Sequence, residues 1–129
     1  MSNSEIQGLD ATTTVGELRQ MVRKFVDERD WQRFHAPKNI SMALAIEASE
    51  LMEHFQWTTV EESRQLSNQD SGTADPKKLA AVGEELADVV CYALAMANEL
   101  EIDLTATMRE KMAKNIAKYP ADEYQGRYE

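Results

Sequence analysis

Apolar residues recur at steps of three and four along four segments of this chain, a spacing that places them on one face of an α-helix. The first segment follows a capping box at Thr14 and Glu17, which predicts a helix over residues 15–29. The second predicted helix, residues 39–56, carries Ile, Met, Leu and Phe around most of its circumference, so we expect it to be largely buried. No segment shows the alternation of a half-buried strand.

Two further helices are predicted to begin at aspartate caps. Asp75 precedes Pro76, which is favoured in a first helical turn, and the apolar pattern then continues over residues 76–100. Asp103 can cap a fourth helix, which ends before Pro120. These signals locate the third and fourth helices independently of their apolar faces.

Four helices with few glycines and prolines and no internal repeat predict an all-α protein, arranged as a four-helix bundle. Residues 1–12 are polar and predict a disordered N-terminal tail, residues 13–120 a single domain and residues 121–129 a C-terminal tail. Residues 58–75 predict a flexible loop, with a short helical turn near residues 60–66.

Two acidic pairs lie inside the two most apolar predicted helices. Glu47 and Glu50 are three residues apart in the second helix, as are Glu85 and Asp88 in the third. Residues at this spacing share a helix face, with Cβ atoms about 5–6 Å apart, so each pair directs two carboxylates toward one point. If the helices pack together, four carboxylates converge, and their burial requires a compensating cation. Carboxylates without cysteine favour a hard ion, Mg²⁺ with Mn²⁺ as a substitute.

A single acidic pair of this kind is also consistent with a solvated helix face, whereas two pairs in apolar helices favour a metal site. His54 follows Glu50 by four residues rather than three, and the third helix has no histidine, which argues against a di-iron carboxylate centre. We expect Glu53 and Glu84 to lie at the periphery of the acidic group.

Charge and composition narrow the possible partners. With 14 basic and 23 acidic residues the net charge is -9, which disfavours binding to a nucleic-acid polymer but allows a small phosphate ligand delivered with its metal. The single cysteine, Cys91, excludes an intrachain disulfide, and its apolar neighbours predict a core position. No run approaches the roughly 20 apolar residues of a membrane span, and the N-terminus has no apolar signal region. We therefore expect a cytoplasmic protein that does not contact membranes.

Aromatic residues offer two readings. Trp31, Phe34 and Trp57 could belong to the core, or they could stack on a flat base, which the basic loop around Trp31 favours. Tyr92 follows Asp88 by four residues, so its hydroxyl lies beside the predicted metal face.

Polar residues on the fourth helix also offer two readings. Lys111, Asn115 and Lys118 share one face near the end of this helix. They could form a solvated face, in which lysine favours the helix C-terminus, or they could contact phosphate.

Four stretches in combination resemble the all-α nucleoside triphosphate pyrophosphatases of the MazG-like superfamily, and most closely the dCTP pyrophosphatase branch: RDWQRFHAPKN, ALAIEASELMEHFQW, EELADVVCYALA and KMAKNIAKYP. The resemblance covers about residues 15–120. It implies Mg²⁺-dependent cleavage of a nucleoside triphosphate, dCTP or a modified dCTP, to the monophosphate and pyrophosphate, as in sanitation of the nucleotide pool. A dUTP-type or broad-range enzyme of the same superfamily, and a non-enzymatic helical module that binds metal, remain alternatives.

The resemblance also implies roles for individual residues. The metal ligands and catalytic residues would be Glu47, Glu50, Glu85 and Asp88, with Glu50 orienting or deprotonating the attacking water. The positions around the base and sugar are Trp31, His35, Lys38, Asn39, Trp57 and Tyr92. The positions near the phosphates are Lys111, Asn115 and Tyr119. Relatives assemble with sites formed partly by a neighbouring subunit, which implies a homodimer or a homotetramer.

Overall fold

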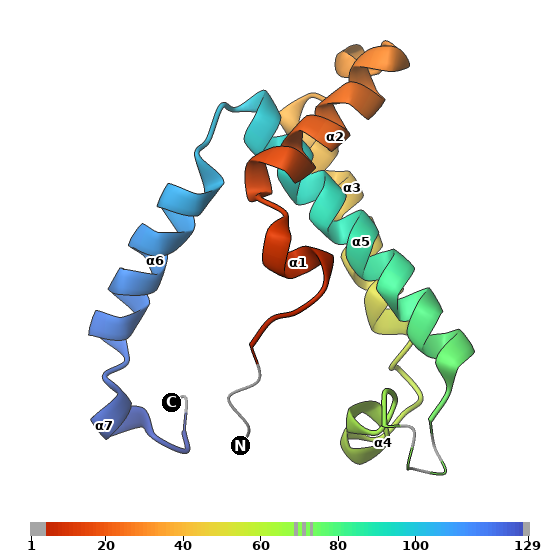
Figure 1. Cartoon of the computed structure of the whole chain (residues 1–129), viewed down its shortest axis with the longest axis vertical. Helices are drawn as coiled ribbons and strands as arrows, with labels where there is room; N and C mark the ends of the chain where they lie inside the picture. Colours follow the sequence, from red (N-terminus) through yellow and green to blue (C-terminus); the bar gives the residue numbers. More distant parts are fainter. Residues whose placement is uncertain (1–4, 69, 71, 73, 128–129) are drawn as a thin grey trace.

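The computed structural model describes residues 5–68, 70, 72 and 74–127, and these residues form helices, turns and loops without a strand (Figure 1). The helices in chain order are α1 (Leu9–Thr12), α2 (Val15–Glu28), the 3₁₀ turn η1 (Gln32–Phe34), α3 (Pro37–Glu53), α4 (Val60–Arg64), α5 (Pro76–Glu99), α6 (Leu104–Lys118) and α7 (Ala121–Tyr124). The predicted all-α class is therefore confirmed for the described part of the chain.

Side-chain caps start the long helices at the predicted places. The hydroxyl of Thr14 accepts the backbone N–H of Glu17 at 3.1 Å and starts α2. Asp75 and Asp103 each accept a backbone N–H three residues further on, both at 3.0 Å, and so cap α5 and α6. α3 begins two residues earlier than predicted, because Pro37 occupies its first turn, where a missing N–H has no cost.

The polar segment 58–75 contains α4 at the place of the predicted helical turn. Here Thr59 and Glu62 form a complete capping box, in which each side chain accepts the backbone N–H of the other, at 3.1 and 3.3 Å. At Thr14 and Glu17 the hydroxyl instead donates to the carboxylate at 3.3 Å. A reciprocal box thus stabilises the short helix, which buries none of its residues.

Three helices make up the packed part of the chain. α3 and α5 lie side by side and run in opposite directions, and α2 packs on α5 (Figure 1). The core contains Val22 of α2, Ile40 of α3, and Leu94 and Ala95 of α5. These residues come from the first turn of α3 and the last turns of α5, so the core lies at one end of the α3–α5 pair. The acidic pairs lie further along the same pair.

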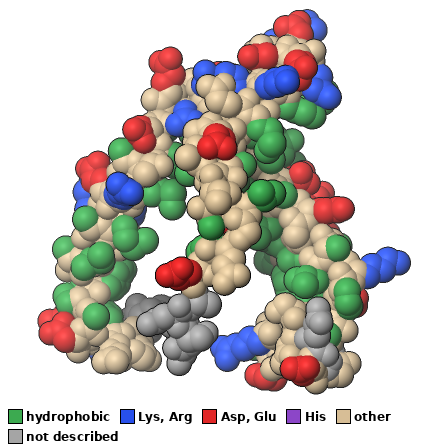
Figure 2. Space-filling view, viewed as in Figure 1, with side chains coloured by type: hydrophobic (Ala, Val, Ile, Leu, Met, Phe, Trp, Pro, Cys, Tyr) green, Lys and Arg blue, Asp and Glu red, His purple; other side chains and the backbone are tan. Residues whose placement is uncertain are grey.

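α6 diverges from the other long helices after leaving the end of α5 (Figure 1). Within the described residues, extensive packing joins α3 to α5 and α2 to α5, but not α6 to either. Figure 2 shows hydrophobic side chains along α6 open to solvent, and Met108, Met112 and Ile116 are each more than half exposed. A single chain therefore does not close the predicted four-helix bundle.

Two burial predictions are wrong for the single chain. Ile40 is the buried residue of α3, whereas Met42, Ile46 and Met52 are at least half exposed. Cys91, predicted to lie in the core, is exposed on α5. Both differences have one cause, because among the described residues extensive packing joins α2, α3 and α5, and no other helix packs extensively on the remaining faces of α3 and α5.

Each segment predicted as a tail contains one helical turn. α1 lies within the N-terminal segment 1–12 and α7 within the C-terminal segment 121–129, and neither buries a residue. Residues 1–4 and 128–129 of these segments lie outside the described residues. No helix in the described part of the chain combines the length and apolar character needed to cross a membrane.

Candidate functional site

α3 and α5 bring three carboxylates together about halfway along their contact. Glu47 and Glu50 of α3 and Glu85 of α5 each place a carboxylate oxygen within 4.8 Å of the other two. The spacing of three residues puts Glu47 and Glu50 on one face of α3, and the packing of α5 on this face adds Glu85. The structure thus brings together three of the four predicted metal ligands.

Two oxygens of this carboxylate cluster are buried without a partner. Oε2 of Glu47 and Oε2 of Glu85 are inaccessible to solvent and accept no hydrogen bond. A buried carboxylate oxygen without a donor is costly unless a proton or a cation compensates it. The donor set, oxygen atoms from three carboxylates, suits a hard divalent cation, so these residues fit the metal predicted from the sequence.

The carboxylates also perturb one another. The adjacent Glu85 carboxylate raises the pKa of Glu47, because a proton shared between the two stabilises the neutral form, and desolvation raises it further. Glu47 in turn raises the pKa of Glu50, by hydrogen bonding and by charge repulsion. The pKa values of Glu47 and Glu50 are therefore higher than those of isolated glutamates, so a cation competes with protons for these two carboxylates.

Asp88 lies at the edge of the carboxylate cluster. It follows Glu85 by one turn of α5, and its charge contributes to the raised pKa of Glu47. Its side chain is exposed and lies outside the three-carboxylate group. Asp88 also lines an adjacent pocket, so it stands between the acidic cluster and that pocket.

An apolar pocket of about 500 Å³ lies between α2, the loop before α3, and α5. Its lining residues are Met21, Val22, Phe25, Val26, Trp31, His35, Asp88, Cys91, Tyr92 and Ala95. Phe25 meets Trp31 edge to face with 5.6 Å between ring centroids, and the His35 and Tyr92 rings lie 6.4 Å apart at a tilt of 32°. Four aromatic rings suit a ligand with a flat ring, and a cation held by the neighbouring carboxylates would let the same ligand carry an anionic group.

Trp31 lines this pocket, and its stacking on a base stays a prediction. The side chain is 41% exposed and lines the pocket, so it does not belong to the buried core. Met21 and Phe25 of α2, which the sequence analysis did not single out, form the wall beside it. The available signal was their spacing of four residues directly before the Trp31 loop, which places both on one face of α2.

The remaining residues predicted around the base and sugar lie outside the pocket. The Asn39 amide donates to the carbonyl of Phe34 at 3.4 Å, a long hydrogen bond between the first turn of α3 and η1. Lys38 is exposed in the same turn of α3. Trp57 is 88% exposed beyond the end of α3.

The predicted phosphate-contacting residues lie on or directly after α6. Lys111 is exposed, Asn115 is half-buried, and the Tyr119 ring packs edge to face on Tyr124 with centroids 5.2 Å apart. Because α6 diverges from α3 and α5, the single chain does not bring these residues to its own carboxylate cluster.

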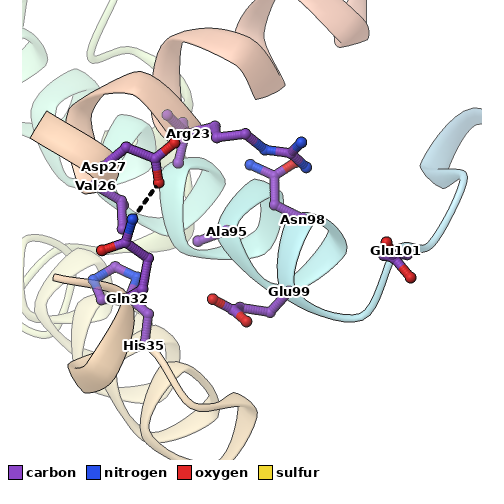
Figure 3. Close-up of a pocket in the computed structure, with 10 residues that line it drawn as sticks. Arg23, Val26, Asp27, Gln32, His35, Ala95, Asn98, Glu99 and Glu101 are labelled. Carbon is purple, nitrogen blue, oxygen red and sulfur yellow. Dashed lines mark hydrogen bonds between the residues drawn. The ribbon is translucent and has the colours of Figure 1, made fainter. Parts of the chain in front are cut away.

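A smaller polar pocket of about 240 Å³ lies on the other side of His35 (Figure 3). Its polar lining comes from Arg23, Asp27, Gln32, Asn98, Glu99 and Glu101, and Gln32 donates to Asp27 at 2.6 Å. It shares Val22, Val26, His35 and Ala95 with the apolar pocket. None of the predicted metal ligands lines it, so the apolar pocket is the one that adjoins the carboxylate cluster.

Comparison with known proteins gives concordant matches. The MazG-like family matches residues 42–129. The dCTP pyrophosphatase 1 of Homo sapiens is 39% identical over 108 residues, which cover 84% of this chain and 60% of the relative. The Rattus norvegicus protein of the same name is 38% identical over 107 residues, covering 83% of this chain and 59% of the relative. The chain thus spans about three fifths of the length of these relatives.

A solved structure also matches. The crystal structure of a pyrophosphatase from Archaeoglobus fulgidus superimposes with a TM-score of 0.68 at 32% sequence identity. The match covers 92% of this chain and 99% of that one. The arrangement of helices is therefore that of a known pyrophosphatase fold.

The raised pKa values predict how pH and metal change stability. In metal-free protein, Glu47 and Glu50 bind protons more tightly when folded than when unfolded, so stability falls as pH rises above about 4.5. We expect Glu47→Gln to melt above the wild type at pH 7.5 in EDTA, because the variant removes one of the mutually repelling carboxylates. Mg²⁺ should raise the melting temperature of the wild type more than that of the variant.

Thermal melts at pH 5.0 and 7.5, with EDTA or with MgCl₂, test this expectation. Glu28→Gln, which removes one exposed carboxylate at the end of α2, serves as the charge-matched control. If Mg²⁺ stabilises Glu47→Gln as much as the wild type, the three carboxylates do not form a common cation site.

Proposed function

The chain belongs to the MazG-like family, and from this premise we propose that it hydrolyses a nucleoside triphosphate between the α and β phosphates, releasing the monophosphate and pyrophosphate. The observation that carries the proposal is the carboxylate cluster of Glu47, Glu50 and Glu85 beside an apolar pocket with aromatic walls. The curated relatives are named dCTP pyrophosphatase 1, so dCTP or a modified dCTP is the proposed substrate.

In the proposed mechanism Glu47, Glu50, Glu85 and Asp88 hold Mg²⁺, for which Mn²⁺ can substitute. The ion would neutralise charge on the phosphates and lower the pKa of a bound water. The unpartnered buried oxygens of Glu47 and Glu85 support this ligand set. Glu50 would orient the water or take its proton.

The base occupies the apolar pocket in this proposal. A volume of about 500 Å³ falls within the range of small-ligand sites, and Trp31, Phe25 and Tyr92 offer ring surfaces for stacking. His35 and Tyr92 supply polar atoms for the base or sugar. Asp88, which lines this pocket beside the cluster, would lie where the nucleoside joins its phosphates.

We further propose that the site is completed by a second copy of the chain, in a homotetramer or a homodimer. Lys111, Asn115 and Tyr119 would then contact the phosphates held by a neighbouring subunit. The proposal is supported by the divergence of α6 and by the exposed apolar side chains on α6 and α3. A helix with an open apolar face gains stability by packing against a partner.

Product analysis tests the reaction class. We expect Mg²⁺-dependent release of pyrophosphate from a pyrimidine deoxynucleoside triphosphate, measured by incubating the protein with each dNTP and identifying the phosphate products.

Glu50→Gln and Asp88→Asn should each lower turnover at least about a hundredfold while the protein stays folded, because ligand charge is lost and volume is kept. Orthophosphate as the first product would contradict the pyrophosphohydrolase proposal. Cleavage of dUTP or of many nucleotides would favour the dUTP-type or broad-range alternative.

Trp31→Ala tests the pocket. Stacking on the base is worth on the order of 1–3 kcal/mol and is similar in the ground and transition states, so KM should rise about 5- to 100-fold with a smaller change in kcat. Because the side chain is 41% exposed, the melting temperature should change little. A variant that melts far below the wild type, yet binds dCTP normally in its folded fraction, would place Trp31 in the core instead.

Mixing two impaired variants tests the shared site. Suppose that each site combines the carboxylates of one copy with α6 of another. Co-refolding Glu50→Gln with Lys111→Met then makes half of the dimers mixed, and each mixed dimer has one intact site out of two. We therefore expect about a quarter of the wild-type activity. Either variant refolded alone is the control. No recovery, despite mixed oligomers detected by mass spectrometry, would show that each chain forms its own site.

A further inference from the structure

The direction of α6 is set at a four-residue corner after α5, residues 100–103. Glu101 has φ +53°, a left-handed conformation that costs energy for a residue other than glycine. The N–H of Ile102 donates to the carbonyl of Ala97 at 3.0 Å and folds the chain back over the end of α5. Asp103 then caps α6. Such a strained corner persists only if surrounding contacts hold it.

Arg19 of α2 supplies those contacts from outside the corner. Its guanidinium donates to the carbonyl of Ala97 at 3.0 Å, to the carbonyl of Ile102 at 2.6 Å and to Oδ1 of Asn98 at 2.9 Å. The Asn98 amide returns a bond to the carbonyl of Arg19 at 3.1 Å. We call these four bonds the Arg19 clamp. The clamp joins both sides of the corner to α2, and it places a cation at the negative end of the α5 dipole.

Within the described residues, Leu104 in the first turn of α6 packs against the core, but the later turns have no extensive packing that could fix the direction of the helix. A helix of 15 residues is about 22 Å long, so a rotation of about 10° at the corner moves its far end by about 4 Å. Misplacement of a contacting group by about 1 Å can cost on the order of a hundredfold in rate. A small rotation of α6 at the corner therefore causes a large displacement of Asn115 and Tyr119.

We propose that Arg19 is a positioning residue for the reaction, acting through α6. Resting on the proposed function, the inference is that the Arg19 clamp holds α6 at the angle at which Lys111, Asn115 and Tyr119 reach the nucleotide phosphates. Arg19 contacts the corner from α2, and neither the carboxylate cluster nor the apolar pocket includes it. The planar guanidinium presents its donors to the three acceptors in a fixed fork, whereas a lysine ammonium is a compact charge on a flexible stem.

Three variants separate positioning from charge and from general stability. Arg19→Ala removes the three bonds that the guanidinium donates. Asn98→Ala removes only the two bonds that the Asn98 side chain makes, and it can be used if Arg19→Ala fails to fold. Arg23→Ala is the matched control, because Arg23 lies one turn further along α2 and beside Asn98, yet the three acceptors of the clamp bond to Arg19 (Figure 3). It removes the same charge near the end of α5.

We expect Arg19→Ala to lower kcat/KM at least about tenfold for the folded protein, Asn98→Ala to lower it less, and Arg23→Ala to stay within about twofold of the wild type. In a Lys111→Met background, Arg19→Ala should lower kcat/KM by a smaller factor than in the wild type, because one of the three groups that it positions is already lost. Hydrogen exchange in nucleotide-free protein should show at least about tenfold faster exchange at the Ile102 amide in Arg19→Ala, with unchanged exchange in α3.

The outcomes are distinct. If the wild type is active and the losses from Arg19→Ala and Lys111→Met multiply independently, or if exchange at Ile102 is unchanged, Arg19 does not act through α6. If Arg23→Ala reproduces the loss, the effect is one of charge and the inference also fails. If the wild type releases no pyrophosphate, the proposed function fails and this role fails with it, whatever the exchange data show.

Discussion

Repulsion among carboxylates in the contact between α3 and α5 is the constraint on which the rest of this molecule depends. Glu47, Glu50 and Glu85 converge at a place where two of their oxygens have neither water nor a donor. The apolar core around Ile40 and Leu94 lies at one end of the helix pair and holds the two helices together against this repulsion. Stability and chemistry are thus located at different points along one helix pair, as expected where a functional site breaks the rules that a stable fold follows.

Much of the helical structure and of the acidic cluster could be predicted, because both depend on local spacing. The caps at Thr14, Asp75 and Asp103 start helices at the predicted residues. The prediction that the carboxylates converge rests on two further observations. The acids of each pair lie three residues apart, and both helices are apolar enough to pack together. Local geometry is readable from a sequence because each helix carries its own periodicity.

The packing between helices was harder to predict from the sequence. An apolar helix face shows that something covers it but not whether the cover comes from the same chain, so the burial predicted for Met42 and Cys91 is wrong for the single chain. A pocket wall looks like core in the sequence, which is why Met21 and Phe25 were not singled out. The angle of α6 depends on three bonds from Arg19, a residue about 80 positions away, and no local pattern encodes it.

The two halves of the candidate site also come from different parts of the chain. The carboxylates and α6 lie within residues 42–129, which match the MazG-like family, whereas Met21, Phe25, Trp31 and His35 in the pocket wall precede that range. Substitutions in the N-terminal part can therefore reshape the pocket without disturbing the helix pair that carries the acids. A fold divided in this way lets the shape of the pocket and the geometry of the acids vary independently of one another.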